Sequence, residues 1–298
     1  MCSVINFLNF MSIEFPKIPA AAIEEPINSD NDKNQESPKE KTPRRLMFSL
    51  EALAKAQIGK IDVVGKENIS KIPKGKKIII ATTHISDVDL PLVAYVLGND
   101  FNIALTNQSV HHSFKEEPST NIGLRLAGKD NFIPFDYQKD NSGKKNPKFN
   151  PENFVPMKAA LDDGKTMVIA AHNPSYEGKL EKGGYGAVYL ASLDPDSVIL
   201  PVAVNLKSKK SISAKNPLQA MIERPDAEVT IGEPLIVGEI PNLQTIATVM
   251  AKRKNKESIT SEERQKFIEA TKLLENESDK LMRRLAGMTP DEKKGVYK

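Results

Sequence analysis

Short β-branched runs that alternate with helical patterns constrain this chain more than any other sequence feature. Two of the runs, residues 78–80 and 198–204, are continuously apolar, which is typical of strands buried on both faces of a sheet. Stretches with helical periodicity separate the runs, and one of them, residues 151–163, is followed by the common helix-ending residue glycine. The alternation predicts an α/β fold with a mostly parallel central sheet and helices on both faces.

The same patterns give approximate boundaries for the elements. The expected strands span residues 61–64, 77–82, 101–105, 131–135, 166–171, 198–204 and 229–232. The expected helices span residues 45–58, 88–97, 121–127, 151–163 and 186–193, followed by a long C-terminal helix that Thr260 begins and Gly287 ends. Thr260 and Glu263 have the spacing of a capping box. The apolar stripe expected to pack this helix on the sheet comprises Phe267, Ala270, Leu274, Leu281 and Leu285.

The first 45 residues differ in composition from the rest. Five prolines lie between residues 16 and 45 among Asn, Asp, Glu and Lys, which predicts a weakly ordered leader and linker over residues 1–45. Residues 46–298 are expected to form a single domain. Residues 1–15 are apolar but have no Lys or Arg, so no secretory signal is expected. A short surface anchor and an alternative start at Met11 remain open.

Charge and cysteine content exclude several classes of protein. The 42 Lys and Arg against 39 Asp and Glu give a net charge of +3, too small to indicate a nucleic-acid partner but compatible with loose contact with anionic lipid. No apolar run approaches the roughly 18 residues that span a bilayer.

The single cysteine, Cys2, cannot form an internal disulfide, so a reducing, cytoplasmic location is expected. Peripheral contact with the inner face of the membrane stays open, because helix 45–58 either lies in a bilayer interface or packs on the domain.

The clearest cluster of chemistry-bearing residues follows the second expected strand. His84, Ser86 and Asp89 lie where that strand gives way to the next helix, and open α/β sheets place their sites at the carboxyl ends of strands. A carboxylate in the first turn of the helix can meet the imidazole, fix its tautomer and stabilise its protonated form. Asp87 is a rival partner. The alternative is that His84 only caps the helix.

Blocks along residues 61–235 resemble, in order, the phospholipid/glycerol acyltransferase family. The segment VGKENI at residues 64–69 is similar to the family's G-x-E-N, and THISDVD at residues 83–89 is similar to N-H-x-S-x-x-D, with Thr83 in place of Asn. Phe132 and Ile133 match the middle of the second block, G-x-x-F-I-x-R. The segments EGKL at residues 177–180 and VILPV at residues 198–202 look like parts of the third and fourth blocks, and the sequence IGEP at residues 231–234 is similar to a strand found after them.

This resemblance implies a glycerol-3-phosphate acyltransferase-like fold and O-acyl transfer. A fatty acyl group would move from acyl-CoA or acyl carrier protein to a hydroxyl of a glycerolipid-like acceptor, with His84 as general base and Asp89 as its partner. No metal or other cofactor is implied, and the adjacent pair His111 and His112 makes a poor metal site. The substrate-binding candidates are Ser86, Phe132, His172, Asn173, Ser175 and Lys179.

Two departures from the family pattern concern phosphate binding. Phe135 stands where the second block ends in Arg, and HNPSY at residues 172–176 stands where the third block reads E-G-T-R-S. Arginine suits phosphate because its planar fork donates two charge-assisted hydrogen bonds. Either the acceptor carries no phosphate, or other cations serve, for which the candidates nearby in sequence are Arg125, Lys129, Lys179 and Lys182.

His172 follows the expected strand 166–171, so parallel pairing should bring it to the same sheet edge as His84. There it would hydrogen-bond an acceptor, replace part of the lost positive charge if protonated, or simply cap nearby backbone. The departures also leave a binding protein without catalysis as an alternative to the enzyme. Thioester hydrolysis is a further, weaker alternative. The sequence does not determine the oligomeric state.

Overall fold

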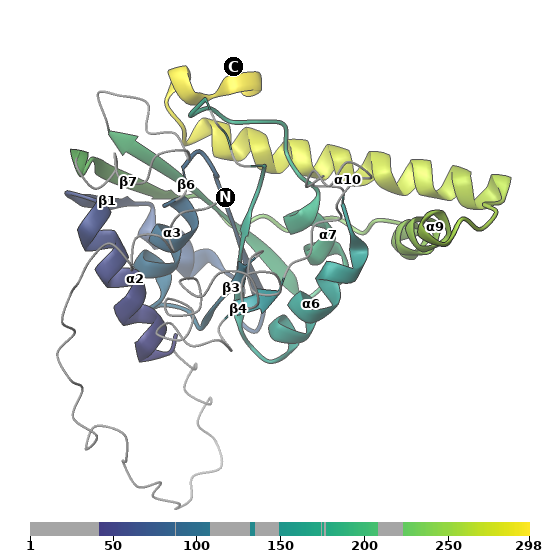
Figure 1. Ribbon diagram of the computed structural model, residues 1–298, viewed down its shortest axis with the longest axis horizontal. Helices are drawn as coiled ribbons and strands as arrows, with labels where there is room; N and C mark the ends of the chain where they lie inside the picture. Colours follow the sequence, from purple (N-terminus) through teal and green to yellow (C-terminus); the bar gives the residue numbers. More distant parts are fainter. Residues whose placement is uncertain are drawn as a thin grey trace, which may run out of the picture.

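The structure is a computed structural model that describes residues 42–86, 88–107, 132–134, 149–173, 175, 177–207 and 223–298. Within these residues, seven strands form one sheet in the order β1-β7-β6-β2-β5-β3-β4 (Figure 1). Neighbouring strands run parallel except for the antiparallel pair of β6 and β7. The predicted α/β fold with a mostly parallel sheet is confirmed.

Strand boundaries agree most closely with the prediction in the first two strands. The strands are β1 (Ile61–Val64), β2 (Lys77–Thr82), β3 (Ile103–Asn107), β4 (Phe132–Pro134), β5 (Thr166–Ala170), β6 (Ser197–Lys207) and β7 (Asp226–Ile231). The bounds of β1 and β2 are those predicted. β6 is longer than predicted because its last residues pair with β7 beyond the reach of β2.

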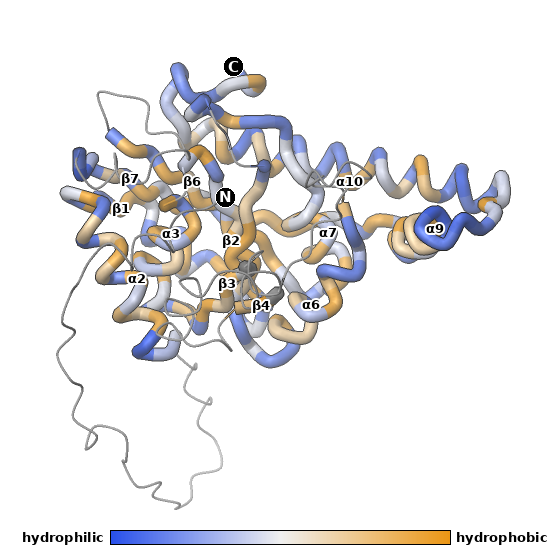
Figure 2. The backbone as a smooth tube through the Cα atoms, in the orientation of Figure 1, coloured by the Kyte–Doolittle hydropathy of each residue, from blue (hydrophilic) through white to orange (hydrophobic). Residues whose placement is uncertain are grey.

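Helices cover both faces of the sheet and bury two apolar clusters. On one face lie α2 (Arg44–Gln57) and α3 (Asp89–Leu97). On the other lie α6 (Phe154–Asp162), α7 (Gly186–Ser192) and α10 (Ser261–Gly287), with α9 (Leu243–Asn255) beside α10. Short 3-10 turns lie at Lys66–Lys71, Pro151–Asn153, Asp291–Lys293 and Gly295–Tyr297. Figure 2 shows the strands as mainly hydrophobic segments beneath helices of mixed hydropathy.

The long helix α10 begins with the predicted capping box. The Thr260 hydroxyl accepts the Glu263 N–H at 3.1 Å, and the Glu263 carboxylate accepts the Thr260 N–H at 3.0 Å. Four of the five expected stripe residues are buried, but Phe267 is only half-buried and lies 4.7 Å beneath the Arg253 guanidinium of α9. The reason is that the first part of α10 extends past the sheet and packs on α9 instead (Figure 1). Helix α9 was not predicted. Gly287 is the last residue of α10 and not the residue that follows the helix.

The described part of the chain includes Thr42, which precedes the predicted start of the domain. Its hydroxyl donates to the Phe101 carbonyl at 2.5 Å and accepts the Ile103 N–H at 2.9 Å. The apolar stripe of α2 is buried, as Leu46 and Leu50 show, and it packs against α3, whereas Phe48 is exposed. In the part of the chain that the structure describes, no helix is both long enough and apolar enough to span a bilayer.

Several sequence predictions lie outside the described residues. They are the leader up to residue 41, the helix 121–127, Phe135, and the candidates Asp87, His111, His112, Arg125 and Lys129.

Candidate active site

Parallel pairing brings the ends of β2 and β5 to one edge of the sheet. Thr82, the last residue of β2, is in register with Ala170, the last residue of β5. The backbone N–H of His84 donates to the Nε2 atom of His172 at 3.0 Å. The prediction that these two histidines share a sheet edge is confirmed.

Asp89, the first residue of α3, anchors the loop that carries His84. Its carboxylate is completely buried. The Oδ2 atom accepts the N–H groups of Ile85 at 2.6 Å and Ser86 at 3.0 Å, and the Oδ1 atom accepts the Ser86 hydroxyl. These three hydrogen bonds fix the turn between the end of β2 and the start of α3.

The structure therefore corrects the predicted role of Asp89. No hydrogen bond or ion pair joins the His84 ring to the Asp89 carboxylate, although both residues are described. The physical reason is that the N–H groups of residues 85 and 86 have no strand or helix partner and lie nearer to a first-turn carboxylate. Asp89 contacts the backbone of the loop that carries His84, and not the His84 ring.

The tautomer of His84 is set by the main chain. Its Nδ1 atom lies 3.2 Å from the Ser86 carbonyl oxygen. Because a carbonyl can only accept, Nδ1 carries the proton and Nε2 carries a lone pair. Burial of the largely buried ring lowers the pKa of His84, and the bond to Ser86 acts in the opposite direction. The imidazole is thus neutral at neutral pH, with a lone pair on Nε2.

His172 is buried, and both of its ring nitrogens contact the main chain. Its Nε2 accepts the His84 N–H, and its Nδ1 donates to the Asn173 carbonyl at 2.7 Å. Burial lowers the pKa of His172 to about 4, the bond to Asn173 opposes this, and the neighbouring His84 lowers it further. The suggestion that a protonated His172 replaces a missing positive charge is wrong, because both ring nitrogens are occupied in the neutral form.

Ser175 closes the loop from the other side. Its N–H donates to the His84 carbonyl at 2.9 Å, and its buried hydroxyl accepts the Lys179 N–H at 3.1 Å. The side chains of Asn173 and Lys179 are exposed. His84 is therefore held at its N–H by His172 and at its carbonyl by Ser175.

Phe132 lies apart from this cluster. Phe132 is on the edge strand β4, where it pairs with Leu105 of β3. Strands β3 and β5 separate β4 from β2. Lys182, offered by the sequence as a phosphate-binding cation, is exposed and paired with Glu275 at 2.7 Å. The structure thus brings together His84, Ser86, Asp89, His172 and Ser175, and it separates Phe132 from them.

Lys293, which no sequence pattern indicated, is brought to the site by the C-terminal segment. Its half-buried ammonium donates to the Leu206 carbonyl at 2.7 Å. Burial raises the pKa of Asp89 to about 7, whereas the Ser86 and Ile85 donors and the charge of Lys293 act in the opposite direction. Burial lowers the pKa of Lys293, which the charges of Asp89 and Glu292 oppose. No local pattern marks this lysine, because it follows the last predicted helix.

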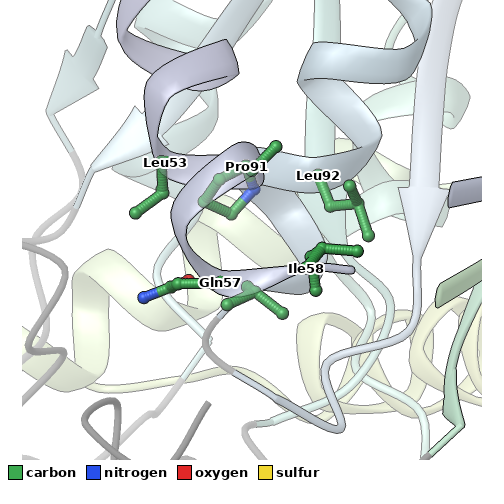
Figure 3. A pocket seen from close by; sticks show the side chains of 7 residues that line it. Leu53, Gln57, Ile58, Pro91 and Leu92 are labelled. Carbon is green, nitrogen blue, oxygen red and sulfur yellow. The ribbon is translucent and has the colours of Figure 1, made fainter. Parts of the chain in front are cut away.

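A small apolar pocket lies behind the loop, between the end of α2 and the start of α3 (Figure 3). It is lined by Leu53, Ala54, Gln57, Ile58, Val88, Pro91 and Leu92. The side-chain oxygen of Gln57 is buried there without a partner among the described residues. The pocket contains none of the site residues.

Comparisons with known proteins find no matching family model and no matching curated protein. Among solved structures, the chain is similar to the crystal structure of the 1-acyl-sn-glycerophosphate (LPA) acyltransferase from Thermotoga maritima. The similarity covers 79% of this chain and 81% of that chain, at 18% sequence identity and a TM-score of 0.40. The roles of the residues in this chain are therefore inferred from their own contacts.

Proposed function

We propose that this protein is an O-acyltransferase that moves a fatty acyl group from acyl-CoA or acyl carrier protein to a hydroxyl of a glycerolipid-like acceptor. One observation carries the proposal. The Ser86 carbonyl holds the Nδ1–H of His84, so the Nε2 lone pair belongs to a neutral imidazole at the carboxyl edge of the sheet. Such a nitrogen is suited to accept the proton of an attacking hydroxyl.

In the proposed reaction, the acceptor oxygen attacks the thioester carbonyl carbon while His84 Nε2 takes the hydroxyl proton. A carbon–oxygen bond forms, the carbon–sulfur bond breaks, and the departing thiolate receives the proton back from His84. No covalent enzyme intermediate is needed. General-base assistance is typically worth about 10²–10⁴-fold, so alignment of the two substrates must supply much of the remaining acceleration.

The contacts around His84 support a positioning role for its neighbours. Its N–H is bonded to His172, its carbonyl to Ser175, and the two residues after it to Asp89. A base held at successive backbone points keeps its geometry during proton transfer. Asp89, His172 and Ser175 therefore position the base without touching substrate.

The proposal includes a reducing, cytoplasmic location with peripheral contact with the inner face of the membrane, where lipid acceptors lie. The exposed ring of Phe48 and the exposed side chains of Arg44 and Arg45 on α2 support that contact. Aromatic and basic residues on one helix are typical of binding at an anionic lipid interface.

A transfer assay tests the function. Purified protein is incubated with a labelled acyl thioester and a cellular lipid extract, and the products are separated. We expect label in ester lipid, reduced about 10²–10⁴-fold by His84→Ala with an unchanged melting temperature. His84→Asn is the matched variant, because its amide can still donate to Ser86 but supplies no base, and we expect the same loss. Unchanged turnover in either variant would reject His84 as the base.

The same assay separates the other interpretations. Thioester binding without any product from the wild-type protein would support a binding protein that lacks catalysis. Free fatty acid in place of ester lipid would indicate hydrolysis.

A further inference from the structure

The segment that follows α10 is tied to the wall of the candidate site. The Leu180 N–H donates to the Lys293 carbonyl at 2.8 Å, and the Gly183 N–H donates to the Tyr297 hydroxyl at 3.0 Å. Gly183 also forms an isolated β-bridge with His172. The C-terminal segment, residues 289–298, is thus linked to the residue that holds the His84 backbone.

A glycine makes this close docking possible. Gly295 has a φ of +55°, and a Cβ atom there would lie 2.0 Å from the Leu180 carbonyl oxygen. Any other residue would be strained and would also displace the backbone. The C-terminal segment therefore packs in one position against Leu180, and this packing fixes the position of Lys293.

The position of Lys293 relative to the loop follows from strand β6. The Lys293 ammonium binds the Leu206 carbonyl, and Leu206 lies two positions beyond Val204 on that strand. The Val204 N–H donates to the Thr83 hydroxyl at 3.0 Å, and Thr83 directly precedes His84. At about 3.3 Å per strand residue, the carbonyl that Lys293 binds is roughly 7 Å along β6 from that contact. The ammonium is therefore at the same carboxyl edge as the base.

The Lys293 ammonium has N–H donors without a bonded partner among the described residues. One of its three N–H groups goes to Leu206, and Lys293 forms no ion pair with any residue that the structure describes. Its neighbour Lys294, in contrast, pairs with Asp291 at 2.7 Å. Lys293 is thus a partly desolvated cation without a bonded counter-charge at the edge where a ligand would bind.

The neighbour of Leu206 on β6, Asn205, holds the end of α10. Asn205 is 3% exposed, and its amide donates to the Met288 carbonyl at 3.0 Å. Its buried Oδ1 atom has no hydrogen-bond partner among the described residues. An amide oxygen only accepts, so the partner that it lacks would be a donor and not a phosphate, and the contact with the anion is left to Lys293.

We propose that Lys293 determines substrate specificity by binding the phosphate of a substrate at the edge of the sheet that carries His84. This inference rests on the proposed function and names the substrate group that the site holds. Lysine binds phosphate as a point charge through charge-assisted hydrogen bonds. The phosphate has two sources, the thioester carrier and a phosphate ester on the acceptor.

Four substrate pairs test the inference with the full-length protein. The donors are palmitoyl-CoA and the phosphate-free palmitoyl thioester of N-acetylcysteamine; the acceptors are a monoacylglycerol phosphate and a monoacylglycerol. Loss of a charged hydrogen bond weakens binding by about 10–100-fold. We expect Lys293→Met to raise KM by that factor for one phosphate-bearing substrate, with kcat nearly unchanged and the phosphate-free counterpart unaffected. The KM that rises identifies the source.

Two further variants control the experiment. Lys293→Arg should restore most of the affinity, and Lys294→Met, which removes the same charge one residue away, should change neither KM. The Leu180 bond to the main chain of residue 293 is kept in all of them. Equal losses with phosphate-bearing and phosphate-free substrates, or no loss at all, would overturn the inference.

A binding measurement decides the inference if the wild-type protein transfers no acyl group, which would reject the proposed function alone. Coenzyme A and glycerol 3-phosphate are then titrated calorimetrically. Binding that Lys293→Met abolishes would sustain the phosphate site. Binding of neither compound, or binding that the variant leaves unchanged, would overturn it.

Discussion

Charged groups at the two ends of strand β2 have different kinds of bonding partner. At the amino end, the Lys77 ammonium lies 2.6 Å from both the Asp162 and the Asp194 carboxylate. At the carboxyl end, the buried Asp89 carboxylate binds the neutral donors of Ile85 and Ser86, with no cation bonded to it among the described residues.

The pKa shifts follow this difference. Burial alone would raise the pKa of Asp194, but the hydrogen bonds from Lys77 and the Asp196 N–H together lower it. Burial raises the pKa of Asp89 to about 7 despite its donors. Direct pairing thus makes the amino-end charges favourable, whereas the carboxyl-end charge is retained at a cost in stability. Perturbed carboxylates of this kind occur more often at functional sites than elsewhere in a protein.

The largest expected effect is on the pH dependence of stability. The pKa of Asp89 is about 7 in the folded protein against an ordinary 3.8, so the folded state holds this proton more tightly. Its stabilising contribution is present below about pH 4 and is lost as the pH rises to 7. Relative to Asp89→Asn, the wild-type free energy of unfolding should fall by up to roughly 4 kcal/mol over that range.

Urea denaturation of both proteins between pH 4 and 7 measures this difference. The comparison with Asp89→Asn is needed because His172, whose pKa is lowered to about 4, contributes the opposite slope over the same range. A constant difference between the two proteins would show that Asp89 does not titrate there.

The next largest effect is expected at His172. His172→Ala removes a buried ring with two hydrogen bonds and leaves the His84 N–H without its acceptor. We expect a loss of about 2–3 kcal/mol in the free energy of unfolding, together with slower acyl transfer because the base loses a support. His172→Gln, whose side-chain oxygen can accept the same N–H, should retain more of both. Equal losses in the two variants would argue against a positioning role.

A smaller effect, confined to stability, is expected at the amino end. Lys77→Met leaves the largely buried Asp194 with the more distant Lys158, at 3.5 Å, as its one ion-pair partner among the described residues. This should cost about 1–2 kcal/mol, and Lys158→Met should cost less because Lys77 remains. The transfer rate of the folded protein should not change in either variant. A lowered kcat in Lys77→Met would contradict the claim that the charges at the amino end of β2 affect stability alone.

Much of the fold could be predicted because buried strands leave a continuous apolar signal, as in β2. Helix α9 escaped prediction because the residue before it, Asn242, is in the left-handed region and provides no side-chain cap. The buried residues of the helix, Leu243, Ile246 and Val249, also give only a sparse apolar stripe. The first turns of α10 were assigned to the sheet because the partner that covers them, α9, was unknown.

The candidate site was predicted in position but not in bonding. Parallel register sufficed to bring His84 and His172 together. The spacing from His84 to Asp89 cannot show whether the carboxylate meets the ring or the N–H groups before it, because both lie within reach of a first helical turn. Lys293 reaches the site through tertiary packing of the chain end, for which sequence spacing holds no signal.

The central claim is that Asp89 supports His84 through the loop backbone, and kcat/KM of two Asp89 variants tests it most directly. In Asp89→Asn, the amide oxygen can accept the Ile85 and Ser86 N–H groups while its nitrogen donates to the Ser86 hydroxyl, so the loop is kept. We predict that Asp89→Asn retains acyl transfer within about tenfold of wild type, whereas Asp89→Ala, which frees the loop, loses at least about 100-fold. A loss in Asp89→Asn as deep as that of His84→Ala would contradict the account and show that the carboxylate charge acts on the imidazole itself.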